Sequence, residues 1–218
     1  MDVLFRWGHI VFGVAWIGLL YYFNFVQTEY VKEAEDSAKA DVMKKLAPRA
    51  LWWFRWAALF TFLTGLILLW FITNRLNLAI TFGAVMGTIM MLNVWGIIWP
   101  NQKIVIASTE QVLGGGEAMP EAAGALAKAG LASRTNTLFS LPMLFFMGAS
   151  AHLTGIGRVP ISSDGGTSEL AIGLTLLIVA ALEFNAIKGK TGPMTSVTGV
   201  IHCGIGLMIA LLLIIEFL

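Results

Sequence analysis

Residues Leu51–Thr73 read LWWFRWAALFTFLTGLILLWFIT, and Arg55 is the single charged side chain among them. A helix of about 20 mostly apolar residues is long enough to cross the hydrocarbon core of a bilayer. Trp52, Trp53 and Trp56 cluster at the start of the stretch, and tryptophan is enriched where a membrane meets water. The stretch therefore predicts a transmembrane helix, and it decides the fold class.

Five further stretches have the same apolar character, and the sequence has no alternating ten-residue pattern of the kind that transmembrane barrels show. The five are Trp7–Gln27, Ala79–Asn101, Thr137–Ile156, Glu169–Ile187 and Met194–Phe217. The sequence thus predicts an all-α fold, a polytopic membrane helical bundle with six transmembrane helices. We expect residues 1–218 to form a single integral membrane domain.

The composition agrees with this class and excludes several others. Hydrophobic residues make up 57% of the chain and charged residues 12%, and the mean hydropathy is +0.79. A soluble domain carries about 25% charged residues. The net charge of +1 gives no basic excess for binding nucleic acid. Because Cys203 is the one cysteine, a disulfide framework, a cysteine-rich metal site and a covalently attached c-type haem are excluded.

The distribution of lysine and arginine orients the predicted helices. Of the 14 basic residues, only Arg6, Arg75 and Arg158 fall on the side of the N-terminus, and the others lie in or beside the loops after the first, third and fifth spans. Basic residues concentrate on the cytoplasmic side of a membrane, so the loops at about 28–50 and 103–134 are expected there. Both termini are then outside, in the periplasm, and we expect a multi-pass protein of the bacterial inner membrane.

The two longer cytoplasmic loops carry local structural signals. The first mixes acidic and basic residues at helical spacing, which predicts a helical extension of the first span that bends back at Pro48. The second contains the glycine run 114–116 and then an alanine-rich stretch, which predicts a turn followed by a short surface helix. No strand precedes the glycines and no Gly-Lys-Ser/Thr comes after them, so they do not form a phosphate loop.

The three histidines are candidate functional residues, because an ionisable side chain in a membrane span is costly and usually has a function. Counting the helical rise from the span ends, His9 and His152 lie at similar depth near the outer surface. His202 lies nearer the middle of the membrane. Two histidines from different helices at one level suit the axial coordination of haem b. We predict His9 and His152 as ligands of the haem iron, with His202 in reserve.

Other residues fit the same cofactor. Glycines flank both histidines and allow the close approach that a flat macrocycle needs. Arg6 and Arg158, with Arg75 on the same side, are candidates for contacts with the haem propionates. Trp16 in the middle of the first span suggests packing against a flat cofactor or an ordinary core contact. Two alternatives stay open for the histidines: hydrogen bonds to other helices, and a copper or zinc site.

Glu183 is the acidic residue inside the fifth predicted span, and Asn185 lies two residues later, near the cytoplasmic side. One interpretation is a proton relay or an ion site. The other is a carboxylate near the membrane surface that pairs with Lys188. The sequence leaves both open.

Several motifs, in a fixed order, carry a resemblance to one family. They are Arg6-Trp7-x-His9, Trp16-Ile17-Gly18, Trp53-Phe54-Arg55-Trp56, Asn93-x-Trp95, Pro100-Asn101-Gln102, Ser133-Arg134-x-Asn136 and Ser150-x-His152. Together they resemble the membrane domain of the bacterial membrane-bound urate oxidase (urate hydroxylase) family, also called the urate oxidase N-terminal domain. The resemblance covers the first four spans best and implies a redox role linked to respiratory electron transfer.

In full-length members of that family, the membrane domain precedes a cytochrome c that faces the periplasm. The resemblance therefore implies a short stand-alone member without the cytochrome c module. The outward C-terminus predicted from the basic residues is compatible with the family architecture.

These features lead us to expect a membrane-embedded haem b redox protein, an oxidoreductase if it is an enzyme, that passes electrons to or from a respiratory partner. Its expected partners are membrane lipid and either a periplasmic cytochrome c or a respiratory complex, in a homo- or hetero-oligomer and without nucleic acid. Two alternatives stay open. One is an accessory subunit of a larger membrane respiratory complex without its own cofactor, and the other is a urate-oxidising enzyme that uses a separate cytochrome c.

Overall fold

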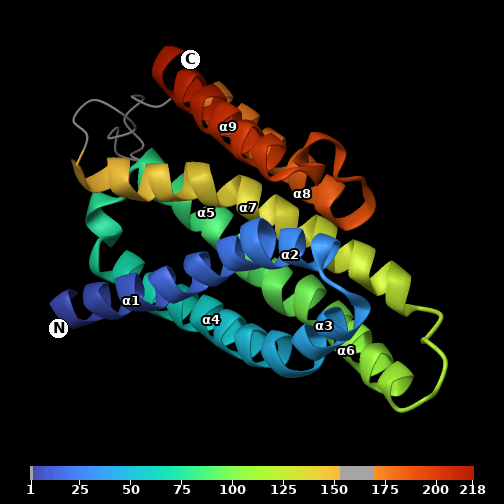
Figure 1. Cartoon of the computed structure of the whole chain (residues 1–218). Helices are drawn as coiled ribbons and strands as arrows, with labels where there is room; N and C mark the ends of the chain where they lie inside the picture. Colours follow the sequence, from blue (N-terminus) through green and yellow to red (C-terminus); the bar gives the residue numbers. More distant parts are fainter. Residues whose placement is uncertain (1, 153–168) are drawn as a thin grey trace.

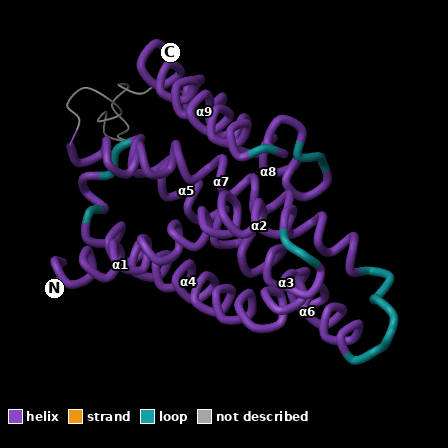
Figure 2. Tube along the Cα trace, viewed as in Figure 1, coloured by secondary structure: helices purple, strands orange, loops and turns teal. Residues whose placement is uncertain are grey.

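Helices make up nearly all of the chain in the computed structural model, which describes residues 2–152 and 169–218 (Figure 2). Neither range contains a β-strand, so the predicted all-α fold is confirmed for these residues. Arg158 and the end of the predicted fourth span, residues 153–156, lie outside the described residues.

The α-helices are joined by short π-helical and 3₁₀-helical segments, written η, and by a few turns. Their bounds are α1 Asp2–Tyr21, η1 Tyr22–Gln27, α2 Thr28–Glu33, α3 Asp36–Asp41, η2 Val42–Leu46, α4 Ala47–Phe71, η3 Thr73–Arg75, α5 Leu78–Asn93, η4 Val94–Ile98, α6 Trp99–Leu113, α7 Ala122–His152, α8 Glu169–Lys188, η5 Gly192–Thr195 and α9 Val197–Phe217.

Three long helices form where α-helical and π-helical segments join end to end. They run over Asp2–Glu33, Asp36–Phe71 and Leu78–Leu113, with 32, 36 and 36 residues. At a rise of about 1.5 Å per residue, each is longer than the hydrocarbon core of a bilayer, which is about 30 Å thick. Each can therefore cross that core and extend past it, as the predicted helical extension of the first span requires.

Five helices of the described ranges are long and apolar enough to cross a membrane, namely these three together with α8 and α9. The predicted fourth span lies in α7, which is not one of them. α7 contacts α1, α5, α6, α8 and α9, and its residues 131–140 are almost all buried, including the polar Thr135, Asn136 and Thr137. Because these polar side chains face protein, α7 does not need the uniformly apolar composition of a helix that faces lipid.

The chain reverses after the first long helix, but not at the predicted position. Ala34 and Glu35 have extended backbone conformations, with ψ of 152° and 156°, and they separate α2 from α3. Pro48 lies instead inside the continuous helix Asp36–Phe71, where the π-helical segment η2 passes into α4. The prediction of a bend at Pro48 was therefore wrong.

The glycine run 114–116 forms the predicted turn between α6 and α7. Gly115 has a φ of 88°, a left-handed conformation that glycine adopts without steric cost. The alanine-rich stretch after it is not a separate surface helix, because it forms the first turns of α7 and continues unbroken to His152. A single glycine such as Gly130 does not stop this helix, since good helix formers surround it.

The long helices lie side by side, and both termini point toward the same end of the bundle (Figure 1). α1 packs on α4, α5 on α7, and α7 on α9. Large apolar side chains cover the outside, for example Trp70 and Phe217, which are 79% and 80% exposed. An apolar exterior of this extent is compatible with a membrane protein.

The contact between α7 and α9 depends on a proline and a glycine. Pro142 lies inside α7 and has no N–H to donate to the carbonyl of Leu138, four residues earlier. Gly204 of α9 faces this carbonyl: a Cβ atom built on Gly204 would lie 3.1 Å from the Leu138 oxygen and 2.6 Å from Cδ1 of Leu141. Glycine at position 204 therefore lets α9 approach α7 closely at this point.

We predict that Gly204→Ala lowers the free energy of unfolding by about 1–3 kcal/mol, because the added methyl group overpacks this interface. The measurement is thermal or denaturant unfolding of the protein in detergent. Gly206→Ala on the same helix is the matched control, since no described atom lies within 4 Å of a Cβ atom at that position. Equal stability of the two variants would contradict the close contact between α7 and α9.

Candidate functional site

A cavity of about 800 Å³ lies between α1, α4, α5 and α7. Pockets that bind cofactors and small ligands have volumes of about 300–1,000 Å³. The lining is mostly apolar and includes His9 and Trp16 from α1, Gly65 from α4, Gly87 from α5, and Met143 and Gly148 from α7. The cavity is thus large enough for a cofactor and is built by four helices.

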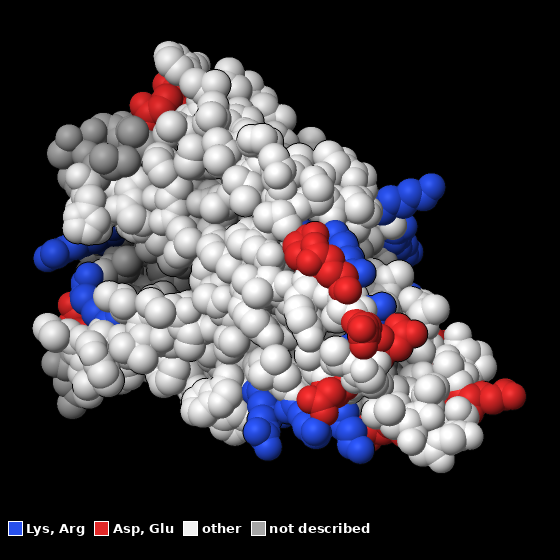
Figure 3. All heavy atoms as spheres, viewed as in Figure 1, with Lys and Arg blue, Asp and Glu red and all other residues white. Residues whose placement is uncertain are grey.

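The lining also includes polar residues from the end of the bundle where α1 begins. Arg6, Arg75, Asn77 and Ser150 are among them. Figure 3 shows a hollow in the surface at this end, with basic side chains beside it. Arg6 is paired with Asp2 at 2.9 Å, whereas Arg75 has no carboxylate within ion-pair distance in the described part of the chain. This part of the cavity therefore carries unbalanced positive charge.

His9 is held in a defined orientation by α4. Its Nδ1 lies 2.9 Å from the carbonyl oxygen of Thr61 and 3.2 Å from Oγ1 of Thr64. A carbonyl oxygen only accepts hydrogen bonds, so Nδ1 carries the proton and donates it. In a neutral imidazole Nε2 then keeps its lone pair, and no described residue is hydrogen-bonded to it. This tautomer is the one a metal-binding histidine uses when its other ring nitrogen is fixed by a carbonyl.

Gly65 makes the approach of the imidazole to α4 possible. A Cβ atom at this position would lie 3.1 Å from Cε1 of His9, tighter than ordinary van der Waals contact. The residues Thr61, Thr64 and Gly65 form one face of α4 against which the ring lies. The sequence analysis did not identify Thr61 and Thr64 as part of the site. Two hydroxyl side chains three residues apart, in a stretch that is otherwise apolar, were the signal that could have indicated them.

The predicted site residues do not all meet at this cavity. His9 and Arg6 line it. His152 is exposed at the end of α7 and is not part of the lining, although its neighbours Ser150 and Ala151 are. His202 is exposed on α9, and Arg158 lies outside the described residues. The structure therefore brings His9 and Arg6 together at the cavity, and leaves His202 apart from it.

Trp16 lies at the cavity, which is the position that packing against a flat cofactor requires. Its side chain is 2% exposed, and its buried indole N–H donates to no described residue. A buried donor without a partner is costly unless a ligand or water accepts its hydrogen bond. Met143 and Met147 also line the cavity and add two thioether groups.

The described ranges contain no group of three or more His, Cys, Asp or Glu side chains that could hold a metal ion. A zinc or copper ion held by protein groups alone needs about three such ligands or more. Haem iron needs one or two protein ligands, because the macrocycle supplies the others. The described donors around the cavity are therefore too few for a bare ion, and only a group that brings its own ligands could be held by one or two of them.

A second set of polar residues joins α5, α7 and α8 away from the cavity. Nδ2 of Asn93 donates to Oδ1 of Asn136 and to Oε2 of Glu183, each at 3.0 Å. Nδ2 of Asn136 donates to the carbonyl of Met90 at 2.9 Å. Glu183 is thus hydrogen-bonded to Asn93, while Lys188 lies over the ring of Phe184.

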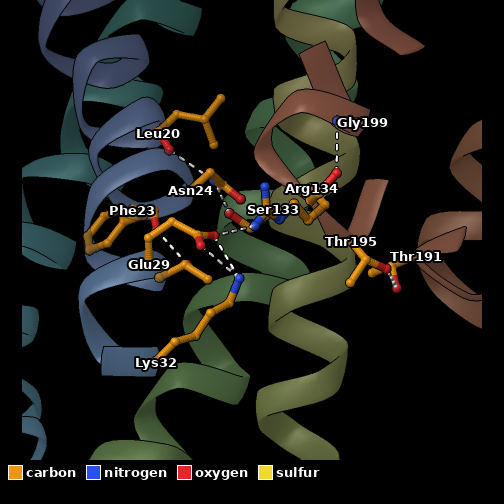
Figure 4. Close-up of polar contacts among 12 residues, drawn as sticks. Leu20, Phe23, Asn24, Glu29, Lys32, Ser133, Arg134, Thr191, Thr195 and Gly199 are labelled. Carbon is orange, nitrogen blue, oxygen red and sulfur yellow. Dashed lines mark hydrogen bonds and ion pairs between the residues drawn. The ribbon is translucent and has the colours of Figure 1, made fainter. Parts of the chain in front are cut away.

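A third set joins the end of the first long helix to α7 (Figure 4). Nδ2 of Asn24 donates to Oγ of Ser133 at 2.8 Å and to the carbonyl of Leu20 at 2.9 Å. Arg134, 5% exposed, lies 3.9 Å from the carboxylate of Glu29. These contacts fix the register of α7 against the first helix, as buried polar pairs between helices do.

The comparisons with known proteins agree with the resemblance found in the motifs. The family model described as urate oxidase N-terminal matches residues 71–159. This range spans α5, η4, α6 and α7, and it includes Asn93 and Asn136. The search of curated proteins and the search of solved structures gave no match. The resemblance to the urate oxidase N-terminal family is therefore confirmed for residues 71–159.

We predict that Asn136→Ala lowers the free energy of unfolding by about 1–3 kcal/mol, because it removes two buried hydrogen bonds, the one that Asn136 accepts from Asn93 and the one that it donates to the Met90 carbonyl. Unfolding in detergent, monitored by circular dichroism, measures the change. Asn101→Ala is the matched control, because Asn101 donates within its own helix, to the carbonyl of Ile97. The role given to this polar set is wrong if both variants are as stable as the parent protein.

Proposed function

We propose, from the match of residues 71–159 to the urate oxidase N-terminal family, that this chain is a membrane-embedded redox protein. In this proposal the cavity between α1, α4, α5 and α7 would hold haem b, and His9 would bind its iron. The protein then exchanges electrons with a respiratory partner. The family match by itself supports only the coarser link to an oxidoreductase.

The tautomer of His9 is the observation that carries the proposal. The Thr61 carbonyl accepts the proton of Nδ1 at 2.9 Å, which leaves the Nε2 lone pair for coordination. The same hydrogen bond fixes the plane of the ring, so that little side-chain entropy is lost when a metal binds. Thr61 therefore acts as a positioning group for His9.

The shape of the cavity suits a flat, mostly apolar group. Gly18 of α1 and Gly148 of α7 both line it, and no described atom lies within 4 Å of a Cβ built on either residue. Small residues leave room for the face of a macrocycle between two helices. Trp16 adds a buried aromatic surface and an N–H donor that has no partner among the described residues.

The charged residues of the lining suit the propionate groups of haem. Arg6 and Arg75 both line the cavity, and guanidinium groups form strong charge-assisted hydrogen bonds with carboxylates. Arg75, which the sequence already offered beside Arg6 and Arg158, has no carboxylate partner among the described residues. The propionates would then lie at the end of the bundle where α1 begins.

Three residues are candidates for a second ligand that would bind the iron. Met143 and Met147 line the cavity, and a thioether is a known axial ligand of haem iron. His152, the predicted ligand, comes directly after the lining residue Ala151 in the chain. We retain His152 and add the two methionines as candidates.

A bound haem supplies one-electron transfer at its iron. The residues of the chain hold and orient it: His9 by coordination, Thr61 by fixing the imidazole, and Arg6 and Arg75 by ion pairs. The apolar lining excludes water, which favours retention of the cofactor and sets its potential. Electrons would leave or enter through a separate protein partner.

The family match also favours a second candidate function, oxidation of urate with transfer of electrons to a separate cytochrome c. The uncompensated positive charge at Arg75 would attract an anionic substrate. Reduction of added cytochrome c that depends on urate supports this candidate. An accessory subunit without a cofactor, the third possibility from the sequence, requires that the purified protein holds no haem and co-purifies with a larger complex.

We predict that His9→Ala abolishes stable haem binding, because it removes the histidine that lines the cavity in the described part of the chain. The pyridine haemochrome assay on detergent-purified protein measures the haem-to-protein ratio. His202→Ala is the control, because His202 is exposed on α9 and its replacement should leave that ratio unchanged. Full haem content in both His9→Ala and His152→Ala would refute the assignment of the ligands.

We also predict that Gly148→Leu lowers haem content without unfolding the protein. The new side chain projects from a position where a Cβ atom meets no described atom within 4 Å, so it fills cavity space instead of displacing protein atoms. Gly206→Leu, at a position with equally open surroundings on α9, controls for the added apolar bulk. Equal haem content in the two variants would argue against this cavity as the cofactor site.

A further inference from the structure

Two basic side chains meet at one tryptophan ring outside the cavity. Cζ of Arg55, on α4, lies 3.9 Å from the centroid of the Trp99 ring, and Nζ of Lys103, on α6, lies 5.7 Å from the same ring. Arg55 and Trp99 fall in or beside motifs of the sequence that the proposed redox function does not use. The ring attracts both cations through its π face.

Neither of these two cations is paired with a carboxylate among the described residues. Neither Arg55 nor Lys103 lies within ion-pair distance of any carboxylate in residues 2–152 and 169–218. Three lysines on the neighbouring segment, Lys32, Lys39 and Lys45, are paired with a carboxylate three or four residues away. Because both groups lie within 6 Å of one ring centroid, their like charges repel each other, and an anion bound at this ring would relieve that repulsion.

The position of Arg55 is fixed by its own backbone. The indole N–H of Trp95 donates to the Arg55 carbonyl at 3.1 Å, which ties η4 to α4. The ring of Trp56 then packs against Trp95, with centroids 5.4 Å apart. This aromatic cluster holds α4 and α6 at a set distance, so the two cations stay on Trp99.

The surroundings are those of a membrane interface. Trp52 and Trp53 are 46% and 62% exposed, and tryptophan gathers at the level of lipid headgroups. Figure 3 shows basic side chains along the edge of the molecule near α3 and α4. Farther along α4, Phe60 packs on the ring of Trp56, with centroids 6.0 Å apart, and Phe60 and Leu63 are exposed apolar residues. A ligand here would meet positive charge at one end and an apolar surface at the other.

We propose that Arg55, Lys103 and Trp99 form a binding site for the phosphate group of an anionic phospholipid. The guanidinium and ammonium groups bind the phosphate, and the acyl chains lie along Phe60 and Leu63. The site rests on the proposed membrane location of the chain and does not depend on haem. An anionic lipid bound here would hold α4 to α6 on the side predicted to face the cytoplasm, where anionic lipids attract basic segments.

Native mass spectrometry of the detergent-purified full chain tests the site, with phosphatidylglycerol as the probe and phosphatidylcholine for comparison. We expect phosphatidylglycerol to bind more tightly, and Lys103→Gln and Arg55→Gln each to weaken it about fivefold. Lys128→Gln removes an equal charge from an exposed position on α7 and should have no effect. Because Lys103 is exposed, its replacement leaves the fold intact even if Arg55→Gln does not fold.

Unchanged phosphatidylglycerol binding in Lys103→Gln would overturn the proposal, and so would equal binding of the two lipids. Competition with inorganic phosphate distinguishes a site for the phosphate of a lipid headgroup from a site for free phosphate. If free phosphate displaces the lipid completely at millimolar concentration, the apolar contacts contribute nothing and the lipid site is wrong. The haem content of the same samples is read separately, so lipid binding without haem would contradict only the proposed cofactor.

Discussion

Polar side chains on the packed face of α7 are the constraint on which the rest of the bundle depends, because buried polar groups need hydrogen-bond partners and several of these find them on neighbouring helices. Asn136 pairs with Asn93 on α5, and Ser133 with Asn24 on the first long helix. The hydroxyl of Ser140 donates to a carbonyl of its own helix at 2.7 Å, so Tyr21 donates to Ser140 at 2.9 Å. These pairs fix the rotation and register of α7.

The cavity lies where these pairs stop. Beyond Ser140, α7 lines the cavity with Met143, Met147 and Gly148, which carry no side-chain N–H or O–H to donate to α1. α1 is held there by α4, through the hydrogen bond from His9 to the Thr61 carbonyl at 2.9 Å. The same contact that joins α1 to α4 therefore prepares His9 as a metal ligand. One hydrogen bond, from His9 to Thr61, therefore both packs α1 against α4 and orients the candidate ligand.

Sequence-based prediction succeeded where composition and periodicity decide the structure, and failed where helix rotation decides it. Apolar length was enough to find the helices, and the position of His9 near one end of the first helix came from the helical rise. The orientation of His152 could not be found in this way, because one residue turns a helix by about 100° and Ala151 lines the cavity while His152 does not. The partner of His9 is a backbone carbonyl, and a carbonyl leaves no signal in residue type. The turn at Ala34 also has no signal in the sequence, because neither a proline nor a glycine lies at it.

The central claim is that the chain holds haem b, and an optical spectrum tests it most directly. Protein produced with ample haem and purified in detergent is measured oxidised and then after reduction with dithionite. The account predicts a sharp α-band of the b type in the reduced protein and a constant haem-to-protein ratio between preparations. A featureless visible spectrum would contradict it, and an accessory subunit without a cofactor would then be the better description.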